Sequence, residues 1–161
     1  MPMTDPMNAL RKLQAALDAG AVVLQPCVIH KELRFIHDQP NGMQRFTCAL
    51  LKGEHVSAIS VFVLIQPLNG LHCLQVGYAV REKDRNHGLG YKILAQGIDE
   101  LTHGLSQTPM KEFYLEAVVS TSNGASNKIA QRLLSESRAE IVDSVSGDAA
   151  FQYLKRVQCV A

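Results

Sequence analysis

The hydrophobic period of the sequence changes near Gly88, and this change constrains the fold more than any other feature. Before Gly88, three apolar segments rich in β-branched residues are separated by short turns, at residues 45–51, 56–65 and 71–80. Short connections of this kind join antiparallel neighbours in a sheet. After Gly88, apolar residues recur at helical spacing over residues 88–103, and an apolar strand pattern follows at 111–120. A helix between two strands forms a crossover, so strands 71–80 and 111–120 should be parallel and adjacent.

The flanking segments extend this pattern in both directions. Thr4, Asp5 and Pro6 resemble a helix start, and apolar residues at helical spacing lead to a stop at Gly20. Residues 21–44 are ambiguous, with a short strand at 21–27, a helical turn or two at 29–37 and a loop at 40–42. Towards the C-terminus we expect a helix at 123–134 and a hairpin of strands at 139–145 and 149–156.

These elements predict a mixed α/β (α+β) sheet that is mostly antiparallel, with one central parallel pair. The chain of 161 residues suits a single domain over residues 1–161, with the helix of residues 1–20 packed on it. A formal charge of +1 argues against a general nucleic-acid binder, which carries a strong basic excess.

The cysteines and the apolar runs bear on the compartment. The four cysteines form no CxxC pair, which favours reduced, mostly buried thiols over a zinc site or a redox motif: Cys27, Cys48, Cys73 and Cys159. The N-terminal residues lack the apolar run of a signal peptide, and no stretch approaches a membrane span. We therefore expect a cytoplasmic protein without a metal site, membrane partner or nucleic-acid partner.

The stretch "RNHGLG", from Arg85 to Gly90, connects the strand at 71–80 to the helix that follows. The first turn of a helix exposes free backbone N–H groups and a partial positive charge. Glycines allow the oxygens of a ligand to approach those amides, so the junction can bind an anion such as phosphate. The stretch matches neither G-x-G-x-x-G nor the GK[ST] loop. On the residues alone, an ordinary tight turn remains an equal alternative.

The same stretch resembles the pattern [QR]-x-x-G-x-[GA], which binds the pyrophosphate of coenzyme A in the GNAT acetyltransferase superfamily. Downstream, "YLEAVVSTSNGASNKIAQRLL" resembles the next segment of that family, and "GYAVREKDRNHGLG" resembles the branch that acetylates protein N-terminal amines. The resemblance covers residues 56 to 161. It implies the GNAT-like acyl-CoA N-acyltransferase fold, in which the central parallel pair splays apart at the cofactor site.

The resemblance also implies which residues hold acetyl-CoA. The pyrophosphate would be held by the amides around His87, Gly88, Leu89, Gly90 and Tyr91. Arg85 would add positive charge, and the backbone groups of Tyr78 and Val80 would pair with the pantetheine arm. Asn123 and Ser126 match family positions near the pantetheine and the far end of the cofactor. The alternative interpretation is helix capping, because Ser122 or Asn123 is a good N-cap in any protein.

Two side chains are candidate bases for the acceptor amine. Glu116 is a carboxylate inside an apolar strand, where a charge needs a partner or a cavity. His72 is the second, although an exposed strand histidine is the commoner account. The chain departs from the family pattern twice, because Leu74 replaces a strand carboxylate and Ala130 replaces a helix tyrosine. Either Tyr153 protonates the thiolate, or the thiolate leaves without a dedicated acid.

The predicted function is acetyl transfer from acetyl-CoA to a primary amine of a small molecule or a protein N-terminus. The alternatives are a non-catalytic acyl-CoA-binding or interaction module of the same fold, and a nucleotide-phosphate binder outside the family. The acceptor pocket would involve residues 21–44 and 66–70, where Glu32, His37 and Asp38 are candidate amine ligands. The family also implies a homodimer.

Overall fold

The computed structural model describes residues 5–159 of the chain, so Thr4 of the expected helix start lies outside the described residues. The helices are α1 (Pro6–Asp18), α2 (Leu89–Ser106) and α3 (Gly124–Leu133). The strands are β1 (Gln25–Pro26), β2 (Leu33–Asp38), β3 (Arg45–Lys52), β4 (His55–Leu68), β5 (Leu71–Val80), β6 (Glu112–Ser120), β7 (Arg138–Val142) and β8 (Ala149–Gln158). No helix among the described residues has the length and apolarity of a membrane span.

The strands form one sheet in the order β1-β2-β3-β4-β5-β6-β8-β7. All neighbours in this order are antiparallel except β5 and β6, which are parallel. The mixed sheet with one central parallel pair, predicted from the change of period at Gly88, is therefore confirmed. The crossover between the two parallel strands is α2, as expected.

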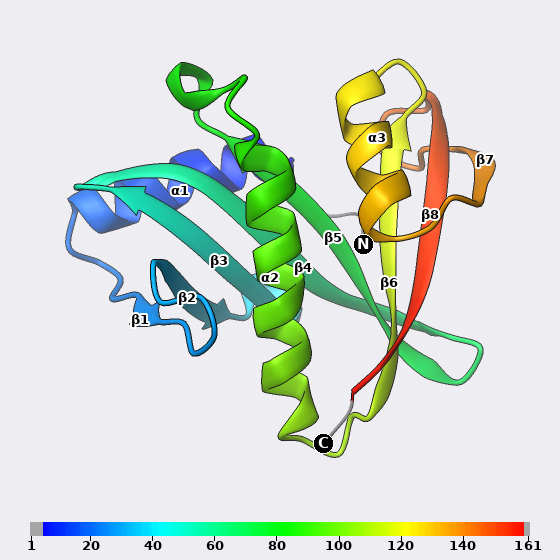
Figure 1. The fold of residues 1–161 in the computed structure, drawn as a ribbon, viewed down its shortest axis with the longest axis horizontal. Coiled ribbons are helices and arrows are strands. Elements are labelled where there is room, and N and C mark those ends of the chain that lie inside the picture. The colour runs from blue at the N-terminus through cyan, green and yellow to red at the C-terminus, as the bar shows by residue number, and fades with distance from the viewer. Residues whose placement is uncertain (1–4, 160–161) are drawn as a thin grey trace.

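The helices cover both faces of the sheet, with α2 and α3 in front and α1 behind in Figure 1. Strand β4 is buried on both faces, which explains its nearly continuous apolar sequence. Its side chains alternate, so that Val61 packs with Leu10 of α1 and Phe62 packs with Leu94 of α2. Helix α2 lies close to β4 at Gly97, where an added Cβ would be 2.1 Å from Oγ of Ser60.

The N-terminal third differs most from the sequence prediction. The helical turns expected at residues 29–37 are wrong, because Leu33–Asp38 forms strand β2 and pairs along its whole length with β3. The short strand expected at 21–27 is reduced to Gln25–Pro26, since proline offers no amide to extend the ladder. Strand β4 continues to Leu68, beyond the predicted turn at Gln66.

Three of the four cysteines are buried and Cys159 is partly exposed, in line with the expectation of mostly buried thiols. Burial raises the pKa of the Cys73 thiol to about 11. The thiols of Cys27 and Cys48 are hydrogen-bonded neighbours, and this contact together with burial raises the pKa of Cys48. These groups therefore belong to the packed interior.

Candidate functional site

Strands β5 and β6 separate part of the way along their length. Their pairing runs from His72 opposite Phe113 to Gln75 opposite Glu116 and then stops. Strand β5 nevertheless continues to Val80, and β6 continues to Ser120. A cavity of about 730 Å³ fills the resulting split and is lined from both faces of the sheet. The sequence-based expectation that these strands splay is thus met by the structure.

The backbone of β5 faces this split. In an antiparallel pair, residues that exchange hydrogen bonds alternate with residues whose backbone groups point away. The amide of Arg81 donates to the carbonyl of Ser57 at 2.7 Å, and the register between β4 and β5 is unbroken here. The backbone groups of Val80 and Tyr78 therefore point away from β4 and towards β6, where a linear ligand could pair with them.

Helix α2 begins beside the split without a side-chain cap. Its N-cap is Gly88, with a φ of 74° in the left-handed region, and the first helical bond runs from the amide of Lys92 to the carbonyl of Gly88 at 3.2 Å. The side chains of Asp5 and Asn123 cap α1 and α3 in the usual way. The first-turn amides of α2 are thus left for another acceptor, which is the local requirement of an anion site.

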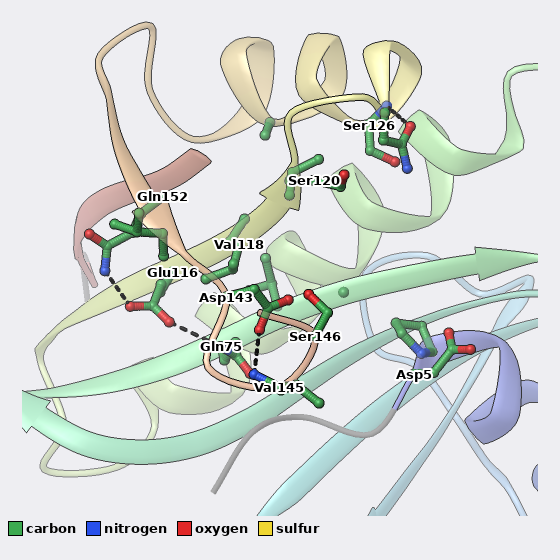
Figure 2. Close-up of a pocket in the computed structure, with 18 of the residues that line it drawn as sticks. Asp5, Gln75, Glu116, Val118, Ser120, Ser126, Asp143, Val145, Ser146 and Gln152 are labelled. Atoms are coloured by element: carbon green, nitrogen blue, oxygen red, sulfur yellow. Dashed lines mark hydrogen bonds between the residues drawn. The ribbon is translucent and has the colours of Figure 1, made fainter. Parts of the chain in front are cut away.

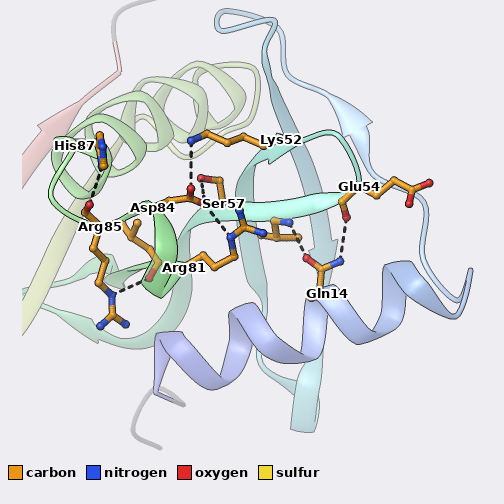
Figure 3. Close-up of polar contacts among 10 residues, drawn as sticks. Gln14, Lys52, Glu54, Ser57, Arg81, Asp84, Arg85 and His87 are labelled. Carbon is orange, nitrogen blue, oxygen red and sulfur yellow. Dashed lines mark hydrogen bonds and ion pairs between the residues drawn. The ribbon is translucent and has the colours of Figure 1, made fainter.

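The loop before α2 is held by a buried carboxylate. Asp84 accepts hydrogen bonds from Nε of Arg81 at 2.8 Å, Oγ of Ser57 at 2.9 Å and Nζ of Lys52 at 3.3 Å (Figure 3). The Arg81 guanidinium, helped by the other two donors, holds the pKa of Asp84 at about 2. This cluster fixes the path of the chain from β5 into the loop, and the sequence patterns did not single it out.

Arg85 and His87 contact the loop itself. Nε of Arg85 donates to the carbonyl of Val80 at 3.1 Å, and its guanidinium reaches towards Sδ of Met7. Nδ1 of His87 lies 2.7 Å from the carbonyl of Arg85 (Figure 3). The Arg85 side chain thus stabilises the end of β5 in this structure, whereas the sequence argument directed it towards phosphate.

On the helix side of the split, Tyr78 reaches across to α3. Its hydroxyl group is hydrogen-bonded to Oγ of Ser126 at 2.7 Å, and both residues line the cavity. A Cβ atom at Gly90 would lie 2.7 Å from Cε2 of the Tyr78 ring, so this glycine makes room for the ring. The sequence indicates a role only for the backbone of Tyr78, because no local pattern reveals a contact between β5 and α3.

Asn123 caps α3 by accepting the amide of Ser126 at 3.1 Å. The capping interpretation of Asn123 is therefore correct. Both residues also line the cavity, so a contact with a ligand is compatible with the cap.

Glu116 lies at the point where the split opens. Its two carboxylate oxygens accept hydrogen bonds from the side-chain amides of Gln75, at 3.0 Å, and Gln152, at 2.7 Å (Figure 2). Both partners are neutral amides, so these two hydrogen bonds position the carboxylate without forming an ion pair. Gln75, Glu116 and Gln152 all line the cavity.

The other proposed acid–base groups lie elsewhere. His72 is exposed and belongs to the closed, paired part of the split, and it does not line the cavity. Tyr153 is fully buried, and its hydroxyl donates to Asn127 at 2.6 Å and accepts from Arg138 at 3.1 Å. Neither side chain faces a ligand in the split.

The candidate amine ligands in residues 21–44 also lie away from the cavity. Asp38 forms an ion pair with Arg45, and His37 stacks on Phe46. Glu32 is exposed and does not line the cavity. The alternative interpretation, a solvated or locally paired surface, describes these residues better.

The cavity is acidic on the side facing α1. Asp5 of the α1 cap, Glu116 and Asp143 of the β7–β8 loop contribute carboxylates, and Figure 2 shows the loop residues Asp143 and Ser146 beside the split. None of the described lining residues is a lysine, arginine or histidine. Such a lining favours a cationic ligand. The sequence predicts a hairpin here, but no motif in the loop after β7 indicates that its residues line the cavity.

No protein-family model matches the sequence, and no curated protein matches it. Solved structures do match. A ribosomal-protein-alanine N-acetyltransferase from Brucella melitensis is 15% identical over 97% of this chain and 81% of its own, with a TM-score of 0.54. A ribosomal-protein-S5-alanine acetyltransferase from Vibrio fischeri is 15% identical over 71% of this chain and 62% of its own, with a TM-score of 0.53. RimL, a ribosomal L7/L12 alpha-N-protein acetyltransferase in complex with coenzyme A, is 19% identical over 72% of this chain and 64% of its own, with a TM-score of 0.51.

These similarities establish the fold and nothing finer. The chain has the GNAT fold, with the split between β5 and β6 at its centre. It spans less than two thirds of the length of the Vibrio and RimL chains.

Proposed function

We propose that the protein transfers an acetyl group from acetyl-CoA to a primary amine of a small molecule or of a protein N-terminus. The observation that carries the proposal is the cavity in the split, which is lined from both faces of the sheet. The residues of the uncapped first turn of α2 do not line the cavity themselves, but Gly90 in that turn lies against the ring of Tyr78, which does, and a carboxylate-rich lining faces α1. An anionic acyl donor and a cationic acceptor can therefore meet in one cavity from opposite sides.

The residues present fit a coenzyme A thioester. The first-turn amides of α2 are free of a side-chain cap and suit a pyrophosphate, and the backbone groups of Tyr78 and Val80 face the split. When bound, acetyl-CoA supplies an activated acyl carbon. An amide of β5 that faces the split on the Glu116 side of Val80, such as that of Tyr78, would donate to the thioester oxygen and polarise it.

Glu116 is the proposed base. An alkyl ammonium must lose a proton before its nitrogen can attack, because amines of this kind resemble lysine in pKa. Gln75 and Gln152 hold the carboxylate at the narrow end of the split, where it can accept that proton directly or through a water molecule. Asp5 and Asp143 strengthen the attraction for an ammonium group in the same cavity. His72 is the weaker candidate, since it lies outside the cavity.

A binding module without chemistry is the second candidate. Ala130 lines the cavity at a position where the GNAT pattern has a tyrosine. Leu74 is buried in the core at a position where that pattern has a carboxylate. These two departures favour a module that binds acyl-CoA without catalysing acyl transfer. The carboxylate lining opposes it, because binding an acyl-CoA alone does not require acidic groups in the cavity.

The test combines binding with thiol release. Calorimetry with coenzyme A and with ATP comes first. A protein that binds coenzyme A but does not bind ATP would be a coenzyme A-dependent protein and not a nucleotide-phosphate binder. Release of free thiol from acetyl-CoA is then followed with small amines and with peptides that carry a free N-terminus. The N-acetylated forms of the same peptides serve as controls.

In this assay, Glu116→Gln should lower kcat on the order of 10- to 1000-fold, as expected for the loss of a general base. Coenzyme A affinity should stay close to that of the wild type. Glu112→Gln is the matched control, because Glu112 lies on the same face of β6 but binds Arg156 and Gln158 outside the cavity. Coenzyme A binding without thiol release by any amine would decide for the binding module.

A further inference from the structure

We propose that the hydroxyl group of Tyr78 is the acid that protonates the departing thiolate, and that Ser126 holds it in place. This inference rests on the proposed function. The two hydroxyl groups are 2.7 Å apart and connect β5 to the first turn of α3 across the split. Both residues line the cavity, and Tyr78 is the only tyrosine among its described lining residues.

Tyr78 and the proposed base lie on opposite faces of the sheet. Gln75 points with Glu116 to one face, and Tyr78, three residues further along β5, points to the other face, towards α3. An attacking amine and a leaving sulfur also lie on different sides of the acyl carbon. The carboxylate is therefore available to the acceptor, and the phenol is available to the leaving group.

The phenol is packed on one side and hydrogen-bonded at its hydroxyl group. Its ring passes Gly90, where any side chain would collide with it, and packs against the core cluster that contains Ala130. On the helix side of the split, the tyrosine hydroxyl group therefore comes from β5, whereas α3 has only the small side chain of Ala130. Tyr153 cannot take this role, because it is fully buried and bound to Asn127.

The proposed step balances in atoms and charge. The ammonium gives one proton to Glu116, the neutral nitrogen forms the C–N bond, and the C–S bond breaks with its electron pair on sulfur. Tyr78 gives its proton to the thiolate, and the hydroxyl of Ser126 donates to the phenolate until it regains a proton from solvent. The amide nitrogen loses its second proton to solvent, and Glu116 then passes its own proton to solvent. Because Tyr78 takes one proton back, one proton is released overall.

The first measurement is made on the binary complex with coenzyme A and needs no turnover. The ultraviolet absorbance of the bound thiolate is followed against pH for the wild type, Tyr78→Phe and Tyr114→Phe. Tyr114 lies on β6, outside the residues that line the cavity, so its variant removes a comparable hydroxyl as a control. A phenol that donates to sulfur stabilises the thiolate, and its removal should raise the pKa of the bound thiol by about one unit or more.

The second measurement is steady-state transfer to the best acceptor. Tyr78→Phe should lower kcat on the order of 100-fold with KM for acetyl-CoA changed only a few-fold. Ser126→Ala, which leaves the phenol but removes its anchor, should fall between Tyr78→Phe and the wild type in both measurements. Tyr114→Phe should match the wild type.

The outcomes separate this inference from the proposed function. Amine acetylation at equal rates by the wild type and Tyr78→Phe, with an unchanged thiol pKa, would overturn the inference and leave the function intact. Weaker coenzyme A binding by Tyr78→Phe, without either effect, would reduce Tyr78 to a structural bridge and also overturn it. A thiol pKa that responds to Tyr78→Phe in a protein that acetylates no amine would support the contact and refute the function.

Discussion

Helix α2 rests on β4 at a glycine, and this contact yields a prediction with an internal control. A Cβ atom at Gly97 would lie 2.1 Å from Oγ of Ser60, 3.1 Å from Cβ of Ser60 and 3.1 Å from Cε2 of Phe62. Gly104 lies in the same helix, and a Cβ there would have nothing within 4 Å. Gly97→Ala and Gly104→Ala therefore make the same chemical change with and without a collision.

The free energies follow from two opposing effects. Replacing a helical glycine by alanine gains up to about 1 kcal/mol from helix propensity. The Gly104→Ala variant should therefore be more stable than the wild type by up to about 1 kcal/mol. Forcing a methyl group into a packed core costs about 1–3 kcal/mol. Rotation of the Ser60 hydroxyl relieves only the closest contact, so Gly97→Ala should end between about 0 and 2 kcal/mol less stable than the wild type.

Urea unfolding at equilibrium measures both variants, and the slope m checks that the transition is comparable. The two variants should differ by about 1–3 kcal/mol, with Gly104→Ala the more stable. In the double variant Ser60→Ala with Gly97→Ala, part of the lost stability should be recovered, because Oγ of Ser60 makes the closest contact with the added methyl group. The effects of the two substitutions are therefore not additive. Equal stabilisation by Gly97→Ala and Gly104→Ala would refute the close approach of α2 to β4.

The remaining predictions concern the loop before α2. Because its neighbours hold the pKa of Asp84 at about 2, below the ordinary 3.8, its contribution to stability is present above about pH 4 and is lost as the pH falls towards about 2. Asp84→Asn should remove this part of the acid dependence. Urea midpoints measured between about pH 2 and 4 would check this. If the midpoint of the variant fell with pH as steeply as that of the wild type, the cluster would not contribute to stability. Gly88→Val should abolish coenzyme A binding while the protein stays folded, since a β-branched residue at a φ of 74° is strained although no atom lies in its way. Gly88→Asn, which tolerates this backbone, separates strain from blockage: calorimetry showing wild-type affinity for both variants would remove the anion site from this turn.

The sequence by itself determined the order and type of most elements. The β-branched runs of β3, β4 and β5, the helical period of α2 and the turn at Gly53 are set by local sterics and by which face is buried. The crossover rule then required β5 and β6 to be parallel. The glycine junction before α2 could also be located, because a left-handed residue at a helix start carries a local signal.

Only the tertiary structure decided how the split is equipped. Strand β2 has no strong period of its own and becomes a strand because it pairs with β3. Gln75 and Glu116 are 41 residues apart in the chain, and Tyr78 and Ser126 are 48 residues apart. Contacts over such separations depend on how the helices pack on the sheet, so a pattern read along one segment has no access to them.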